Sequence, residues 1–385
     1  MKQDIISITG MASVSAMGMG AQEVWNAYLK EGHCLSQMTL NEHEVWVGSC
    51  PQHVLDCIQE IRAGSPRYAS LDTTVLLAML ASRKAFEDAG WALGDAVGVN
   101  IGSSRGATEL FEYSYREFLK TGKTSVFTSP NTTLGNISFW VAQDLQSRGP
   151  EFSHSITCST ALHAVLNGVA WLRSGLAKRF LAGGSEAALT PFTLAQLQSL
   201  RIYSREHGKF PSRAMDFEKE SNTMVLGSGA SMACLEVGEA KNPLAHIKGI
   251  GYASEVLEHP ASLSANANCI QNAMRMALSG YDTESVDVVV LHAPGTLKGD
   301  QAELRAIQEV FGSQTPALTG NKWKIGHTFG ASGMFSLELA VLMLVEQVFI
   351  PTPFNHRAAP NKLNTILVNS VGFGGNAVSI LLERP

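Results

Sequence analysis

The chain has 385 residues, of which 45% are hydrophobic and 16% are charged, and its formal net charge is -5. This composition is too apolar for a disordered chain, and the length is enough for one large domain or two fused halves. The negative balance argues against a protein that binds nucleic acid or an anionic membrane surface over a broad area.

Cysteine spacing and the apolar stretches indicate the cellular compartment of the protein. Six cysteines occur without a CxxC pair, which argues against a disulfide framework and a structural zinc site, so we expect a cytoplasmic protein. The N-terminal stretch carries Asp4 before a short apolar run broken by glycine, unlike a signal peptide. Glu338 and Glu346 interrupt the most apolar stretch, residues 337–350, so we predict a buried helix there and no membrane span.

Short β-branched runs alternate with longer helical patterns along the first 240 residues. This alternation is typical of an α/β architecture whose strands are covered by helices on both faces. The predicted strands are residues 5–12, 96–104 and 179–189, with a glycine-rich strand pair over 224–237. The predicted helices are residues 21–32 and 71–91, followed by one that starts after the SITC stretch near residue 158.

The rest of the chain follows a similar strand and helix plan. Strands are predicted at residues 245–254, 286–291, 365–375 and 377–384, and helices at 269–280 and 337–350. We therefore predict two similar halves, residues 1–240 and residues 241–385.

Residues 155–165, SITCSTALHAV, place Cys158 after a β-branched run that predicts a strand and before an uncharged helical pattern. At such a junction the unpaired backbone N–H groups and the positive end of the helix dipole favour the thiolate over the thiol. This position suits a nucleophile. Free cysteine is also often a small core residue, so this stretch alone leaves both interpretations open.

Two histidines favour the interpretation of Cys158 as a nucleophile over that of a core residue. His292 follows the apolar strand of residues 286–291 and precedes a glycine, while His327 lies among glycines with Lys322 five residues upstream. Each could be structural by itself. One cysteine and two histidines that all lie where apolar segments open into loops favour a catalytic site.

Four stretches together resemble a known family: SITCSTALHAV, HAPGTLKGD, KWKIGHTFGASG and NSVGFGG. They occur in the order seen in the β-ketoacyl-acyl carrier protein synthases and the related chain-length factors, and GHxxGAxG and GFGG are the specific elements. The resemblance covers nearly the whole chain. It implies a thiolase-like α/β fold, in which two similar strand-helix halves form a five-layered αβαβα architecture. The first half then carries the nucleophilic cysteine and the second half carries the two histidines.

The resemblance also implies a reaction, the decarboxylative Claisen condensation of an acyl thioester with malonyl-acyl carrier protein. Cys158 takes the acyl group, and its backbone N–H forms the oxyanion hole together with that of Phe373. His292 and His327 hold the carbonyl of the extender thioester while malonyl loses carbon dioxide, and the resulting carbanion attacks the acyl-cysteine. Two imidazole donors in a dry pocket suit the negative charge that develops on the thioester oxygen.

Other residues receive supporting roles from the same resemblance. Lys322 matches the lysine that tunes the electrostatics of the histidines and the cysteine, and Phe373 also matches an aromatic gate. Thr296, Asp300 and Gly374 are expected to support the loops that bind the substrate.

The chain departs from the family pattern at several positions. Ala293 and Pro294 stand in a loop that usually reads His-Gly-Thr-Gly-Thr, Asn376 follows Gly375 directly, and Ser336 replaces an acidic residue. The changed loop at Ala293 and Pro294 favours a second hypothesis, a partner subunit that resembles chain-length factors and has little or no activity of its own. Retention of Cys158 favours the enzyme. A biosynthetic thiolase should carry a second reactive cysteine that VGFGGNA lacks, and a cysteine hydrolase would need neither the second histidine nor the gate.

The resemblance also implies partners. Acyl carrier protein would deliver its phosphopantetheine arm, and we expect no covalently bound cofactor and no metal, because the sequence has no metal or nucleotide motif. A homodimer, or a heterodimer with a homologous ketosynthase subunit, is expected, with Phe139 and Trp140 on a candidate interface. Among type II polyketide systems, the resemblance suggests pairs that make aryl polyene-like chains.

One basic run remains to be interpreted. It is either a solvated loop or the docking surface for the acidic carrier protein, and it consists of Arg201, Arg205, Lys209 and Arg213.

Overall fold

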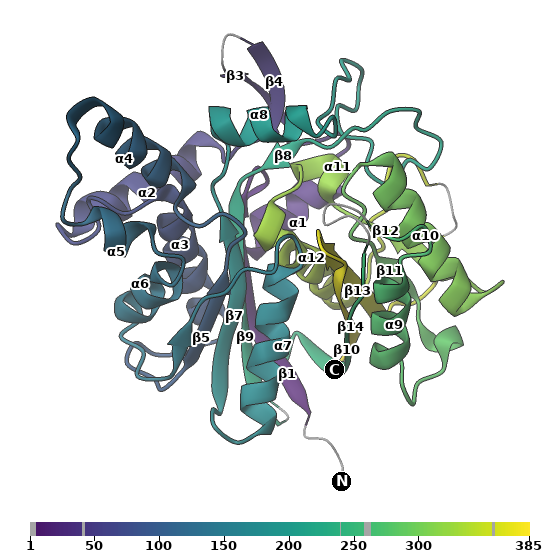
Figure 1. Cartoon of the computed structure of the whole chain (residues 1–385). Coiled ribbons are helices and arrows are strands. Elements are labelled where there is room, and N and C mark those ends of the chain that lie inside the picture. Colours follow the sequence, from purple (N-terminus) through teal and green to yellow (C-terminus); the bar gives the residue numbers. More distant parts are fainter. Residues whose placement is uncertain (1–4, 41–42, 239, 258–262, 356–358) are drawn as a thin grey trace.

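The computed structural model describes residues 5–40, 43–238, 240–257, 263–355 and 359–385 (Figure 1). Its large sheet has eleven strands, and a separate three-stranded sheet has the order β3-β4-β8. The first five strands of the large sheet, in spatial order, are β1 (Ile6–Ser15), β9 (Gly229–Val237), β7 (Arg179–Glu186), β5 (Gly98–Gly102) and β6 (Glu151–Phe152). In this half-sheet β9 is antiparallel to β1 and β7, whereas β5 is parallel to β7 and β6.

The other half of the large sheet repeats this arrangement. Its strands, in the corresponding order, are β10 (Ala245–Ser254), β14 (Asn376–Glu383), β13 (Thr365–Gly372), β11 (Val288–Val290) and β12 (Ala317–Thr319). Each neighbouring pair has the same relative direction as its counterpart in the first half-sheet. A short antiparallel pairing of β1 with β10 joins the two half-sheets. The prediction of two similar strand-helix halves is therefore confirmed.

Helices form three layers around the two half-sheets (Figure 1). The middle layer is α7 (Thr160–Arg173) and α12 (Ser332–Glu346), which contact each other and strands of both half-sheets. The outer layers contain α3 (Thr73–Asp88) against the first half-sheet and α9 (Asn268–Ala277), with α10 (Leu297–Phe311) beside it, against the second. This is the expected five-layered αβαβα architecture.

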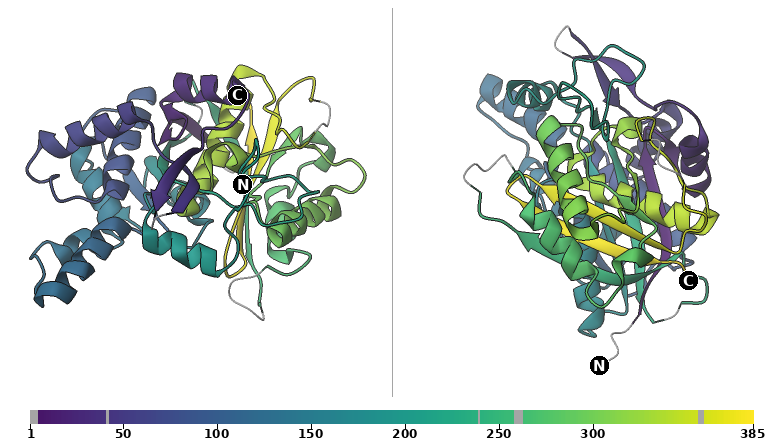
Figure 2. Two further views of the ribbon diagram at one scale, coloured as in Figure 1. Left: turned by 90° about the horizontal axis from the view of Figure 1, so that it is seen from above. Right: turned by 90° about the vertical axis from the view of Figure 1, so that its right-hand side faces the viewer.

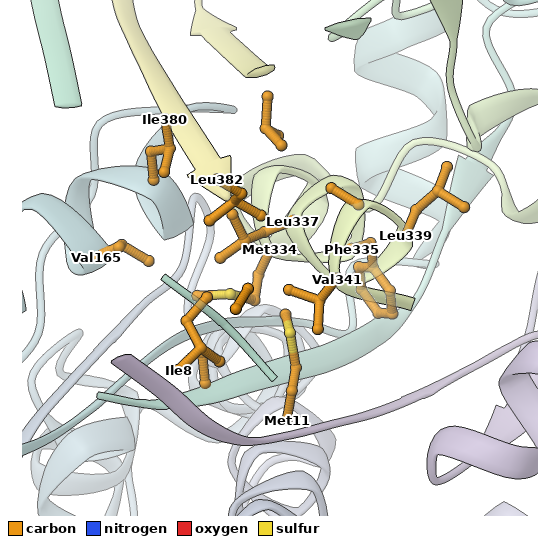
Figure 3. Close-up of a cluster of buried hydrophobic side chains, with 14 of the residues drawn as sticks. Ile8, Met11, Val165, Met334, Phe335, Leu337, Leu339, Val341, Ile380 and Leu382 are labelled. Atoms are coloured by element: carbon orange, nitrogen blue, oxygen red, sulfur yellow. The ribbon is translucent and has the colours of Figure 1, made fainter. Parts of the chain in front are cut away.

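The central helix α12 explains the most apolar stretch of the sequence. Its residues are buried on all sides, which requires apolar side chains around the whole helix rather than along one stripe. Figure 3 shows Met334 and Leu337 of α12 among side chains that include Ile8, Val165 and Leu382. The segment Phe329–Glu346 is long and apolar enough to cross a membrane, but 89% of it is buried inside the protein, as in a core helix. The predicted buried helix is confirmed, and it begins five residues earlier than expected.

The remaining elements surround this frame (Figures 1 and 2). The helices are α1 (Ala21–Leu29), α2 (Gln52–Gly64), α4 (Thr108–Thr121), α5 (Thr128–Thr132), α6 (Asn136–Asp144), α8 (Pro191–Ser199) and α11 (Lys322–Ile325). The short strands are β2 (Gly18–Met19), β3 (Ser36–Leu40), β4 (His43–Gly48) and β8 (Leu226–Gly227), and 3-10 turns span Thr283–Ser285 and Phe329–Ala331. Helix α4 extends away from the sheet at one end of the molecule.

Two local predictions are wrong. The β-branched run before Cys158 is a loop with one isolated bridge, because the Thr160 hydroxyl accepts the Ile156 N–H at 2.8 Å and so removes it from any ladder. The glycine-rich residues 224–237 do not form a hairpin. Strand β8 pairs with β4 in the small sheet, whereas β9 pairs with β1 and β7 in the large one, so the chain crosses between sheets at Ser228.

Candidate active site

Cys158 lies at the buried start of the central helix layer. It precedes α7 by two residues, and its side chain is 8% exposed. The hydroxyls of Ser332 on α12 and Ser370 on β13 each donate to the Cys158 carbonyl oxygen at 3.3 Å. The second half of the chain thus holds the backbone of a residue that belongs to the first half.

The structure brings both predicted histidines together. His292 follows β11 after one residue, and His327 follows α11 after one residue. Their ring centroids are 5.3 Å apart and the rings are nearly perpendicular. Within the part of the chain that the structure describes, His292 Nδ1 and both ring nitrogens of His327 are buried without a hydrogen-bond partner. Such nitrogens are available to a bound group.

Backbone hydrogen bonds to a buried carboxylate fix the loop that carries His292. Glu303 on α10 accepts the backbone N–H groups of His292 and Ala293 at 2.9 and 2.7 Å. Ala293 has a φ of 24°, a conformation that costs energy for a residue with a Cβ and that the Glu303 bonds hold in place.

Asp300 and Thr296 hold the rest of the same loop. Asp300 accepts the Gly295 N–H at 2.9 Å and forms a buried ion pair with Lys219 at 2.7 Å. Thr296 caps α10, since its hydroxyl accepts the Gly299 N–H at 3.2 Å. Both residues therefore shape the loop behind His292.

Burial and a buried lysine together keep the histidines uncharged. Lys322 is buried and, among the described residues, its Nζ has no hydrogen-bond partner. Burial lowers its pKa to about 8, and burial raises the pKa of nearby Glu303 to about 7. Burial, followed by the charge of Lys322, lowers the pKa of both His292 and His327 well below the usual value. Both imidazoles are therefore neutral at pH 7.

The Cys158 thiol is also neutral in this structure. Burial raises its pKa to about 12, although the charge of Lys322 and the backbone N–H of Phe373 act in the opposite direction. The prediction that the helix terminus favours the thiolate is thus wrong for the resting state, because loss of solvent around the sulfur outweighs the favourable local groups. The proton must leave Cys158 when the sulfur reacts.

The turn between β13 and β14 approaches the nucleophile closely. Thr157 donates its hydroxyl to the Phe373 carbonyl at 3.2 Å, and the Phe373 side chain is 42% exposed. A Cβ at Gly372 would overlap the Thr157 hydroxyl and lie 3.1 Å from the Cys158 nitrogen, so this approach requires glycine. Gly374 follows with a φ of 90° and turns the chain back into β14.

Family models match nearly the whole of this chain. The model of the β-ketoacyl synthase N-terminal domain matches residues 3–240, and that of the C-terminal domain matches residues 244–355. The chain belongs to the β-ketoacyl synthase family. Its candidate site thus combines Cys158 of one matched domain with His292 and His327 of the other.

Individual relatives of this β-ketoacyl synthase span its full length. The chain is 26% identical to a 3-oxoacyl-[acyl-carrier-protein] synthase 2 from Coxiella burnetii, with 100% of this chain and 99% of the relative covered. It is 28% identical to nodulation protein E from Rhizobium meliloti, with 97% and 98% covered.

Solved structures share its fold. The ishigamide ketosynthase/chain length factor superposes with a TM-score of 0.87 at 22% identity, with 100% of both chains covered. A ketosynthase in complex with its chain length factor from Xenorhabdus doucetiae has a TM-score of 0.81 at 20% identity, with 99% of this chain and 98% of that chain covered. These structures establish the thiolase-like ketosynthase fold.

Sequence reasoning missed one residue that organises the site of this β-ketoacyl synthase. Glu186 at the end of β7 is fully buried and accepts four hydrogen bonds, from Ser103 Oγ, Ser104 N, Arg105 N and Gly330 N, at 2.7 to 3.0 Å. It ties the loop after β5 to the turn that follows His327. The available signal was an acidic residue at the end of an otherwise apolar strand, in GGSE.

The four cations of the predicted basic run differ in their surroundings. Arg201, Arg205 and Lys209 are exposed, whereas Arg213 forms an ion pair with Asp216. The run therefore offers three exposed cations to a partner rather than four.

Proposed function

We propose that this β-ketoacyl synthase condenses an acyl thioester with malonyl-acyl carrier protein by decarboxylation. The observation that carries this proposal is the buried Lys322, whose charge acts on the Cys158 thiol and on two adjacent neutral histidines whose ring nitrogens have no partner among the described residues. The family assignment supports an acyltransferase, because relatives that match over the full length are named 3-oxoacyl-[acyl-carrier-protein] synthase 2.

In the first step Cys158 would attack the thioester carbonyl. The new carbon–sulfur bond forms as the old one breaks, and the carrier thiol leaves with a proton. A neutral imidazole with a free nitrogen can accept the proton of the Cys158 thiol and pass it to that leaving group. The N–H groups of Cys158 and Phe373 would stabilise the oxyanion, which agrees with the position of the Phe373 N–H beside the sulfur.

In the second step His292 and His327 would donate hydrogen bonds to the carbonyl oxygen of the malonyl thioester. The carbon–carbon bond between the malonyl methylene and the carboxylate breaks, and carbon dioxide leaves. The electron pair of that bond forms an enolate. The enolate carbon then attacks the acyl-cysteine carbonyl, so that a carbon–carbon bond forms, the carbon–sulfur bond breaks, and the sulfur leaves as a thiolate that takes up one proton to restore the resting thiol. Burial, with the positive charge of Lys322, would keep both donors neutral while charge develops on the oxygen.

The loop residues would act through these groups. Asp300 and Thr296 would keep the His292 loop in place, and Gly374 would let the turn carrying Phe373 move. The exposed Phe373 ring would then serve as a gate beside Cys158, because glycines flank it on both sides.

Acyl carrier protein would deliver both substrates on its phosphopantetheine arm. A type II polyketide acyl-carrier protein in complex with its ketosynthase is among the structures that share this fold. Arg201, Arg205 and Lys209 are our candidates for the docking surface, because exposed cations suit an acidic partner. We further propose a cytoplasmic location and a division at residue 240, between β9 and β10.

A second function has a specific observation in its favour. Pro294 follows the strained Ala293 and replaces a residue that could donate a backbone hydrogen bond in the His292 loop. Such a change suits a subunit that shapes the pocket of a ketosynthase partner, as chain-length factors do. This partner would be a homologous subunit in a fatty acid or polyene-like polyketide system.

Intact-mass measurement after incubation with acyl-acyl carrier protein separates the two functions. We expect an acyl adduct on the wild-type chain and none on Cys158→Ala, with Cys234→Ala as a matched control that keeps the adduct. An adduct confined to a copurifying homologous subunit would contradict the condensing function and support the partner subunit.

A further inference from the structure

Arg105 brings a positive charge into the apolar surroundings of the nucleophile. Its guanidinium lies 5.2 Å from the centroid of the Phe329 ring, over the ring face. Phe329 belongs to the same buried hydrophobic cluster as Cys158, and its ring centroid is 5.7 Å from that of His327. Phe329 therefore lies next to both the guanidinium and His327, and the charge of Arg105 also acts on the Cys158 thiol.

The backbone of Arg105 is fixed relative to the nucleophile loop. Its N–H donates to Glu186 at 3.0 Å, and the neighbouring Ser104 hydroxyl donates to the Thr157 carbonyl at 2.8 Å. Thr157 directly precedes Cys158. The backbone that carries Arg105 is accordingly held beside the loop of Cys158.

The guanidinium has donors to spare. Its Nη1 donates to Gln196 Oε1 at 2.6 Å, and none of the ion pairs among the described residues includes Arg105. Glu186 does not supply a partner, since its oxygens already accept the four hydrogen bonds described above. A partly buried guanidinium with five N–H donors normally pairs with a carboxylate.

The other members of this buried cluster are apolar residues of the small sheet, of α8 and of the chain that leads into β8. They include Val45, Val47, Leu194, Leu197, Met224 and Leu226. An alkyl acyl group on Cys158 would lie against these apolar side chains and would cover the guanidinium without pairing with it. The guanidinium would then lose water without gaining a partner, which costs free energy. A carboxylate at the end of the acyl group would instead match the planar fork of the guanidinium.

We propose that Arg105 is a specificity-determining residue that selects acyl groups ending in a carboxylate over plain alkyl groups of the same length. The selection rests on the proposed function, because it concerns the acyl group that Cys158 accepts. Gln196 acts as a positioning residue that holds the guanidinium.

The test compares adipoyl and hexanoyl thioesters on the same acyl carrier protein, in the protein's native assembly. Acylation of Cys158 is followed by intact mass. We expect wild type to react at least about tenfold faster with adipoyl than with hexanoyl. The reason is that hexanoyl cannot form the hydrogen bond between charged groups, and loss of such a bond typically has an effect of this size. Arg105→Met should reverse the preference and Arg105→Lys should retain part of it. Arg67→Met is the matched control, since Arg67 also stacks on an aromatic ring, Trp140, but away from Cys158.

The outcomes separate the selection from the function itself. Adducts that form from both thioesters with a ratio unchanged by Arg105→Met would overturn the role of Arg105 and leave the condensing function in place. No adduct from either thioester on wild type would overturn the condensing function and the selection with it. Thermal unfolding shows whether Arg105→Met is folded, and Arg105→Gln takes its place if it is not.

Discussion

At the scale of single residues, burial decides the chemistry of this site more than proximity to a charge does. Cys158, His292 and His327 are each neutral because the site excludes water, and Lys322 acts on all three from inside the same pocket. Neutral groups suit a reaction in which a proton leaves the sulfur and negative charge then develops on an oxygen.

Lys322→Met should slow acylation of Cys158 by about tenfold or more at pH 7, since it removes the charge that favours the thiolate. The wild-type advantage should disappear as the pH rises through about 8, because Lys322 itself loses its proton there. Initial rates of adduct formation between pH 6 and 9 measure this. Lys324→Met, two residues away, should leave the shape of the profile unchanged, and a constant wild-type advantage across that range would contradict the assigned role.

At the scale of elements, close contacts between segments far apart in the sequence build the site. The end of β13 reaches the loop before α7 only because residue 372 has no side chain. Likewise α12 crosses the core between both half-sheets, so its polar residues Ser332, Ser336 and Glu338 are cut off from solvent.

Gly372→Ala should leave a folded protein whose Cys158 is acylated at least about tenfold more slowly, as the added methyl group pushes the Phe373 turn away from the sulfur. Circular dichroism and intact mass report the fold and the adduct. Gly135→Ala is the control, because a Cβ at Gly135 meets no atom within 4 Å. Equal rates in wild type and Gly372→Ala would show that the close approach is dispensable.

Glu338→Met should stabilise the protein at alkaline pH. Burial raises the pKa of Glu338 to about 7, and only the Ser13 side chain acts in the opposite direction. A carboxyl whose folded pKa lies above the unfolded value stabilises the fold below about pH 4.5, and this contribution is lost as the pH rises through about 7. The substitution should therefore raise the free energy of unfolding by about 3 kcal/mol at pH 8 and by much less at pH 5.

Urea unfolding at pH 5 and pH 8 tests this expectation. Glu346→Met, on the exposed end of the same helix, should change neither value. A gain of equal size at both pH values would mean that packing of the methionine, rather than the buried charge, is responsible.

At the scale of the whole molecule, exposed aromatic residues at one end indicate a subunit interface. Helix α4 buries only Thr108 among its residues, and Phe111, Tyr115 and Phe118 are between 44% and 59% exposed. Phe139 on α6 is 40% exposed, whereas Trp140 is partly buried and packs against Tyr68. The expected interface thus includes Phe139 more than Trp140, and α4 extends it.

Sedimentation should show a dimer, either of this chain or of this chain with its homologous subunit. The double variant Phe111→Glu and Phe118→Glu should shift the protein to monomer, because two charges would be buried in the interface. Leu93→Glu, at a leucine that is 62% exposed outside α4, should leave the dimer intact. A dimer that survives both charges on α4 would place the interface elsewhere.

The sequence alone determined the α/β class, the order of most elements and the identity of the candidate nucleophile and histidines. Those features depend on local periodicity and on short motifs such as GHTFGASG, which are written in consecutive residues. The sequence predicted two similar series of strands and helices but not the order of the strands in the sheet, because single-sequence patterns do not specify which strands pair.

Only the tertiary structure decided the electrostatics and the contacts around the site. The four hydrogen bonds of Glu186, the ion pair of Lys219 with Asp300 and the position of Arg105 over Phe329 join residues 81 to 224 positions apart. The neutral state of Cys158 also depended on burial, which local sequence does not reveal. Long-range packing sets the solvent around each group, and the solvent sets its charge.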